Sequence, residues 1–112
     1  MGSEMCIRDS RQLDGSRSPF DQLKTIVDAV GGKIEIIVDG GIRRGTHVLK
    51  ALSLGATACS FGKGFLFALS AGGQKGVETI LQRMKEELRR DMILLGKKKI
   101  EDLGEENIAI RN

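Results

Sequence analysis

The sequence predicts an α/β fold in which helices and short strands alternate along the chain. Apolar residues recur at helical spacing in three segments, and two short apolar runs bounded by glycines lie between those segments. The order helix, strand, helix, strand, helix is that of repeated βα units, which require a parallel sheet with right-handed crossovers. We therefore expect a parallel sheet covered by helices.

The first helix is predicted from Ser18 to Val30. Ser18 can cap the helix, Pro19 suits its first position, and apolar side chains recur at helical spacing until Gly31 and Gly32 stop the pattern. A proline at the first helical position loses no hydrogen bond, because the N–H that it lacks would be unpaired there. These signals define both ends of the helix.

The next four elements are shorter or less sharply bounded. A buried parallel strand is predicted over residues 33–39, where the β-branched run IEIIV precedes Asp-Gly-Gly. A second helix is expected over 46–54 and a second strand over 56–61. The last helix is expected from about Gly73 to Leu95, with an apolar stripe along one side. Two strands cannot close a barrel, so the chain is expected to be a piece of something larger.

Composition narrows the class of protein. At 112 residues the chain suits one domain, and its hydrophobic fraction of 40% and charged fraction of 29% are typical of soluble globular proteins. No apolar run is long enough to span a bilayer, and the N-terminus lacks the pattern of a secretory signal. We expect no integral membrane segment and a cytoplasmic location.

Charge and cysteine usage exclude further classes. Lys and Arg number 18 against 15 Asp and Glu, a net charge of only +3, and no Trp or Tyr accompanies the basic residues. Nucleic acid is therefore not an expected partner. Cys6 and Cys59 lie far apart, with neither a CxxC pair nor a neighbouring His, so no metal site or redox pair is expected. Cys59 is interpreted as a small core residue.

A glycine-rich segment between the first strand and the second helix is the strongest functional signal. Glycines let the backbone approach an anion, a helix start offers unpaired N–H groups, and an arginine can add charge-assisted hydrogen bonds. The pattern favours a phosphate ligand, although a tight turn with solvated arginines would produce the same residues. The candidate binding residues are Asp39, Gly40, Gly41, Ile42 and Arg43.

A second glycine and cation follow the next strand, at Gly62 and Lys63. In a (β/α)8 barrel, phosphate is commonly bound by the loops after strands 7 and 8. Lys63 alone would be interpreted as a surface lysine. Together the two loops favour a phosphate site at one edge of the sheet.

Three motifs resemble the FMN-dependent α-hydroxy-acid dehydrogenase family, which includes glycolate oxidase and lactate dehydrogenases: RQLDG at 11–15, VDGGIRRGTHVLKALSLGA at 38–56 and FGKGFLFALSAGGQKGV at 61–77. The resemblance implies the C-terminal part of a (β/α)8 TIM barrel, namely the last two βα units plus the preceding helix. It also implies FMN as cofactor, with the residues of the two loops on the side of its phosphate. Lys63 departs from the family, which more often has arginine there.

By the same resemblance, Arg11 holds the substrate carboxylate in a two-pronged contact. Without the family motif, Arg11 would be interpreted as an exposed arginine paired with Asp14. The family's catalytic histidine is expected at position 8, where this chain has Arg8, and a guanidinium cannot accept the proton of the substrate hydroxyl. The other histidine, His47, is interpreted as a surface residue on a helix.

Residues 1–10, MGSEMCIRDS, show neither helical nor strand periodicity and resemble translated adapter sequence. We expect them to be non-native and residues 11–112 to be the C-terminal portion of the barrel. Truncation and an evolved inactive enzyme both account for Arg8.

The resemblance implies that the parent enzyme, expected to be a homo-oligomer, oxidises a small L-2-hydroxy acid of the lactate or glycolate type to the 2-oxo acid by hydride transfer to FMN. Three alternatives remain open. The chain is a non-catalytic fragment, or it belongs to another FMN barrel enzyme such as glutamate synthase or type 2 isopentenyl diphosphate isomerase. The third is a basic adaptor that docks a partner through its long helix.

Overall fold

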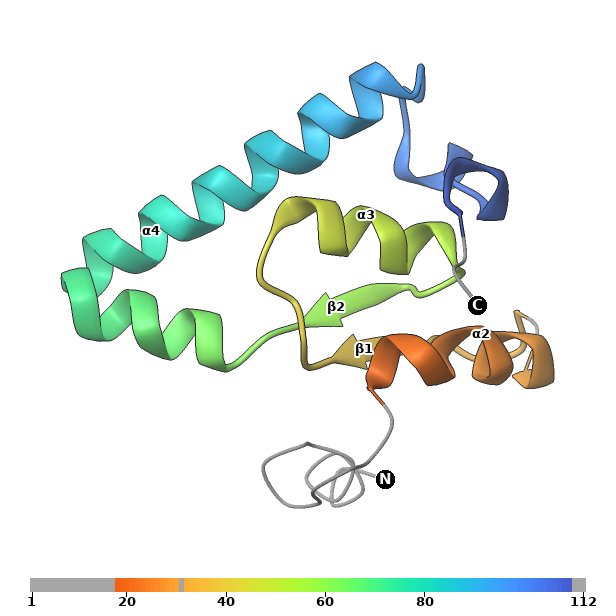
Figure 1. The fold of residues 1–112 in the computed structure, drawn as a ribbon, viewed down its shortest axis with the longest axis horizontal. Helices are drawn as coiled ribbons and strands as arrows, with labels where there is room; N and C mark the ends of the chain where they lie inside the picture. The colour runs from red at the N-terminus through yellow and green to blue at the C-terminus, as the bar shows by residue number, and fades with distance from the viewer. Residues whose placement is uncertain (1–17, 31, 110–112) are drawn as a thin grey trace.

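The computed structural model describes residues 18–30 and 32–109. Helices and strands alternate in the order that the sequence predicts, and two short 3-10 helices follow at the end (Figure 1). The elements are α2 (Pro19–Val30), β1 (Ile37–Asp39), α3 (Gly45–Ser53), β2 (Ala58–Ser60), α4 (Lys63–Leu94), η1 (Ile100–Asp102) and η2 (Glu105–Asn107).

The two strands pair in parallel, as predicted. Asp39 at the end of β1 is the register partner of Ser60 at the end of β2. Both strands are shorter than predicted, because the first predicted residue of each still belongs to the preceding turn. The N–H of Lys33 donates to the carbonyl of Val30 at 2.9 Å, and the N–H of Ala56 donates to the carbonyl of Ala51 at 3.0 Å. Since both strands end at the same level, the two loops that follow begin side by side.

One face of the sheet carries the core. Helix α3 lies between the sheet and α4, while α2 lies beside β1 (Figure 1). The side chains of the core come from α2, β1, α3, α4 and the loops between them, so burial of apolar surface joins every long element. The buried cluster comprises Leu23, Val38, Ile42, Ala51, Ala56 and Met84.

The opposite face of the sheet is open. Along β1, Val38 is 4% exposed whereas its neighbour Ile37 is 63% exposed. Successive side chains of a strand point to opposite faces, so these two values describe one covered and one uncovered face of the sheet.

Large apolar side chains are also exposed outside the sheet. They include Ile34 before β1 and, on α4, Phe65, Leu66, Phe67, Leu69, Leu81, Ile93 and Leu94.

Helix α4 begins ten residues earlier than predicted, at Lys63 instead of Gly73. Gly73 does interrupt the helix: its φ of 59° and ψ of −145° are strained for residues other than glycine, and the helix bends there. The predicted start of the helix at about Gly73 is therefore wrong, because helix lies on both sides of this bend. The short segment 63–72 precedes the bend, and the longer segment 74–94 follows it.

Within the described ranges, no helix is both long and apolar enough to cross a membrane. The same part of the chain brings no three His, Cys, Asp or Glu side chains together in a group that could hold a metal ion.

Candidate phosphate-binding site

The two loops predicted to bind phosphate lie together. The N–H of Gly40 donates to the carbonyl of Ser60 across the sheet at 3.4 Å, directly where the two loops begin. A Cβ built on Gly64 would lie 3.9 Å from the carbonyl oxygen of Ile42, so the start of α4 also borders the first loop. The structure thus brings the residues of both loops to one edge of the sheet.

The glycines of the two loops leave space for a ligand. Gly40 and Gly41 have φ values of 100° and 76°, a region that side chains rarely tolerate. Apart from its chain neighbours, no heavy atom of residues 18–30 or 32–109 lies within 4 Å of a Cβ built on Gly41 or on Gly62. The backbone at both positions is therefore open to close approach by a ligand.

Asp39 and Ile42 occupy different environments within the first loop. Asp39 is the last residue of β1 and is half-buried, and the two loop glycines follow it directly in the sequence. Ile42 is 2% exposed and belongs to the hydrophobic core. The predicted contact of Ile42 with a cofactor is therefore restricted to its backbone, since its side chain packs inward.

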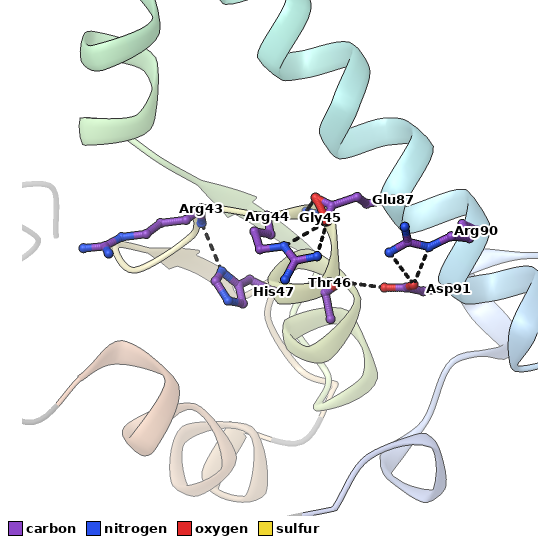
Figure 2. Close-up of polar contacts among 8 residues, drawn as sticks. All are labelled: Arg43, Arg44, Gly45, Thr46, His47, Glu87, Arg90 and Asp91. Atoms are coloured by element: carbon purple, nitrogen blue, oxygen red, sulfur yellow. Dashed lines mark hydrogen bonds and ion pairs between the residues drawn. The ribbon is translucent and has the colours of Figure 1, made fainter.

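The two consecutive arginines of the first loop have separate environments (Figure 2). Arg44 donates from Nε and Nη2 to Oε2 of Glu87 on α4, at 2.9 and 2.7 Å. Hydrogen bonding from this guanidinium lowers the pKa of Glu87, and the carboxylate in turn raises the pKa of Arg44. The side chain of Arg43 extends away from this pair.

The start of α3 is closed by side chains from α4. Oε1 of Glu87 accepts a hydrogen bond from the N–H of Gly45 at 3.3 Å, and Oγ1 of Thr46 donates to Oδ2 of Asp91 at 2.6 Å. The expectation of unpaired N–H groups at this helix start is therefore wrong for Gly45. Glu87 lies 42 positions away in the sequence, and no local pattern identified it.

The start of α4 is open by comparison. Gly62 is its N-cap residue and provides no side-chain hydrogen bond, so the first N–H groups of the helix are without a side-chain cap. Lys63 is exposed at the first helical position. Among described residues, no carboxylate lies within salt-bridge distance of Lys63 or Arg43. A helix start with these properties attracts an anion.

His47 stabilises the first loop from within α3. Its Nδ1 accepts a hydrogen bond from the N–H of Arg43 at 3.1 Å, which requires that nitrogen to be unprotonated. Partial burial, with a smaller effect from Lys50 and Arg44, lowers the pKa of His47. The residue is half-buried, not at the open surface as predicted, and its role here is to hold backbone.

Two predicted positions, Arg8 and Arg11, lie outside the described residues. Cys59 on β2 is a half-buried free thiol, and burial raises its pKa. A thiol in this state is a poor nucleophile, which agrees with the interpretation of Cys59 as a small packing residue.

Two adjacent βα loops with open glycines, an arginine that pairs with no described carboxylate, and a helix start without a side-chain cap from Gly62 form the candidate site for a phosphate group. Comparison with known proteins identifies the family. Residues 9–110 match the FMN-dependent dehydrogenase family, and the chain belongs to it. This confirms the resemblance found in the sequence, and with it an oxidoreductase family whose cofactor is FMN.

Similar proteins include the L-lactate oxidase of Nostoc sp., 45% identical over 93 residues, or 83% of this chain and 26% of that protein. The human 2-hydroxyacid oxidase 1 is 49% identical over 87 residues, covering 78% of this chain and 24% of the relative. The chain thus spans about a quarter of the length of these curated relatives.

Solved structures of TIM-barrel flavoenzymes share the fold. The flavin-binding domain of baker's yeast flavocytochrome b2 has a TM-score of 0.80 at 35% identity, over 90% of this chain and 30% of that one. A mandelate oxidase variant with an FMN adduct has a TM-score of 0.76 at 46% identity, over 80% of this chain and 29% of the other.

Proposed function

We propose that this chain is the C-terminal part of a (β/α)8 barrel enzyme that oxidises a small L-2-hydroxy acid, of the lactate or glycolate type, to the 2-oxo acid. The single observation that carries this proposal is the match of residues 9–110 to the FMN-dependent dehydrogenase family, and the two glycine-containing loops at the carboxyl ends of adjacent strands support it. The open face of the sheet, with Ile37 63% exposed, supports the barrel, because the interior of a barrel would cover that face.

FMN, when bound, would supply the hydride acceptor. The residues of this chain would hold its phosphate: Arg43 and Lys63 by charge, and the backbone of Gly41 and Gly62 by close approach. The fit rests on the described geometry, in which neither glycine has a heavy atom within 4 Å of a built Cβ. Asp39 would complete the first loop at the end of β1.

Arg11 would orient the carboxylate of the hydroxy acid through a two-pronged contact, and this role rests on the family motif alone. Arg8 stands where a base would take the hydroxyl proton, and a guanidinium cannot perform that step. We therefore propose that the 112-residue chain is inactive alone and that the parent enzyme has a histidine at this position. Residues 1–10 are proposed to be non-native. A cytoplasmic location and a homo-oligomeric parent remain predictions.

The test joins the part of Nostoc L-lactate oxidase that precedes the equivalent of Arg11 to residues 11–112 of this chain. The hybrid is expected to retain FMN through gel filtration and to show flavin bleaching on addition of L-lactate or glycolate. The 112-residue chain is expected to bind FMN only weakly, so that it retains little through gel filtration even after incubation with excess FMN, and to show no bleaching. A folded hybrid that binds no flavin would contradict the proposal, and substrate-dependent bleaching by the short chain would contradict its inactivity.

A further inference from the structure

Glu87 contacts the first phosphate loop from a distant part of the sequence. Both oxygens of its carboxylate are used: Oε2 accepts two hydrogen bonds from Arg44, and Oε1 accepts one from the N–H of Gly45. The side chain of Glu87 is 21% exposed and that of Arg44 is 59% exposed, so the carboxylate is partly shielded from water while the guanidinium is not. Three charge-assisted hydrogen bonds meet at this carboxylate and fix its position more firmly than a single exposed ion pair would.

We propose that Glu87 is a positioning residue for the phosphate of the flavin. By binding Arg44 and closing the start of α3, it leaves Arg43 as the arginine, and the start of α4 as the helix terminus, that receive the phosphate. The inference rests on the proposed function and deepens it, because it gives a physical reason why Arg43 and not the adjacent Arg44 would bind the phosphate.

The backbone explains why Arg43 and Arg44 separate. Arg44 has an extended conformation, with φ of −142° and ψ of 158°, and side chains that follow one another in extended backbone point to opposite sides. Because Glu87 draws Arg44 toward α4, Arg43 must extend the other way (Figure 2). Its backbone is held in turn by the hydrogen bond from its N–H to His47.

Charge gives the second reason. At the start of α3, the Glu87 carboxylate already accepts the N–H of Gly45 and neutralises Arg44, so neither group is available to a further anion. At the start of α4, Gly62 provides no cap and Lys63 adds a positive charge. An incoming phosphate is therefore directed to the second loop, with Arg43 reaching it from the first.

Close backbone packing keeps Glu87 within reach of α3. A Cβ built on Gly45 would lie 2.7 Å from the backbone nitrogen of Leu88, so the absence of a side chain at Gly45 lets the two helices touch. Glu87 therefore meets α3 at a fixed place.

The test compares the affinity of the 112-residue chain for FMN and for riboflavin, which lacks the phosphate, by quenching of flavin fluorescence. The unmodified chain is expected to prefer FMN. Glu87→Ala is expected to reduce the ratio of the two affinities about tenfold, as loss of supporting contacts typically does. Glu87→Gln should reduce this ratio less than Glu87→Ala does, because the amide oxygen of Gln can still accept a hydrogen bond from the N–H of Gly45. Glu86→Gln, which removes the same charge one position away, should leave the ratio unchanged.

Riboflavin affinity and far-ultraviolet circular dichroism separate positioning from unfolding. A purely structural role would weaken both flavins together and leave their ratio intact. An unchanged ratio in Glu87→Ala would overturn the inference; if that variant does not fold, an unchanged ratio in folded Glu87→Gln overturns it equally. No preference for FMN in the unmodified chain would instead contradict the proposed phosphate site, so the two failures are distinguishable.

Discussion

The two helices that follow the strands of the sheet begin in opposite ways. At the start of α3, Glu87 accepts the N–H of Gly45 and pairs with Arg44. At the start of α4, Gly62 has no side-chain cap and Lys63 is exposed. Both starts follow a glycine-containing loop at the same edge of the sheet, so sequence context alone makes them look alike. The difference shows that a side chain distant in the sequence decides whether a helix start remains open to a ligand.

In the proposed site both loops contribute. The first loop would supply Arg43 and the open backbone of Gly41, while the second would supply a helix start of the kind that binds phosphate. The bend at Gly73 ends the segment 63–72, which begins at that helix start.

The largest difference between the two helix starts should appear when each glycine becomes alanine. A Cβ on Gly45 would overlap with the carbonyl oxygen of Met84 and lie 2.7 Å from the nitrogen of Leu88, both backbone atoms. Gly45→Ala is therefore expected to lower the free energy of unfolding by about 3 kcal/mol. Gly62→Ala meets no heavy atom within 4 Å and should cost roughly a few tenths of a kcal/mol.

Urea denaturation followed by circular dichroism measures both values. Among folded variants, Gly62→Ala should weaken FMN binding more than Gly45→Ala does, because a methyl group at position 62 would stand where the phosphate approaches. Equal losses of stability in the two variants would mean that α3 and α4 do not pack closely at Gly45.

The two arginines provide the next comparison. Arg43→Gln is expected to weaken FMN binding about tenfold, the effect of losing roughly one charge-assisted contact, without changing the unfolding midpoint. Arg44→Gln should lower the unfolding midpoint, because it leaves Glu87 with a single partner. FMN titration and thermal unfolding of both variants test this prediction. Weaker FMN binding in Arg44→Gln together with a lower unfolding midpoint in Arg43→Gln would contradict the different roles of the two arginines.

A smaller loss is expected at Thr46, whose hydroxyl donates to Asp91 at 2.6 Å. Thr46→Val should lower the free energy of unfolding by about 1 kcal/mol, because it leaves one oxygen of Asp91 without this donor. Thr25→Val, at an exposed position of α2, is the matched control. Urea denaturation should find the control within about 0.5 kcal/mol of the unmodified chain. If Thr25→Val lowers the free energy of unfolding as much as Thr46→Val does, the hydrogen bond from Thr46 to Asp91 does not contribute specifically to stability.

The smallest effect concerns pH. Burial lowers the pKa of His47 below its ordinary value of 6.5, so the unfolded chain takes up this proton before the folded chain does. The contribution of His47 to stability is complete at pH values above 6.5, and it declines as the pH falls from 6.5 through the lower pKa of the folded chain. His47→Asn retains an acceptor but does not titrate, so the difference in unfolding midpoint between the two proteins should change between about pH 7.5 and 5.5. A constant difference would contradict the shifted pKa.

The order of elements and most boundaries were predictable from the sequence, because they depend on local periodicity and on glycine and proline signals. Helix α2 matches its prediction, and α3 (Gly45–Ser53) differs by one residue at each end. The early start of α4 was not predicted, because the glycines around residues 62–73 have low helix propensity. The segment 63–72 is helical nonetheless, although most of its side chains are exposed.

The candidate site was predictable only in part. Loop glycines and cations stand close to one another in the sequence, so their grouping could be inferred. The task of Arg44 could not, because it depends on Glu87, which folding brings to the loop across 43 positions. Burial of Ile42 was likewise missed, since the side of the loop that faces the core depends on α2 and α4.

The most direct test of the central claim is a titration of the ¹⁵N-labelled chain with FMN, followed through its backbone amide signals. If phosphate binds where α4 begins, the signals of Gly62, Lys63 and Gly41 will shift with saturation, while that of Gly45, already bonded to Glu87, will stay in place. Shifts at Gly45 and Thr46 without any at Gly62 would show that phosphate binds at the start of α3 and would contradict the account.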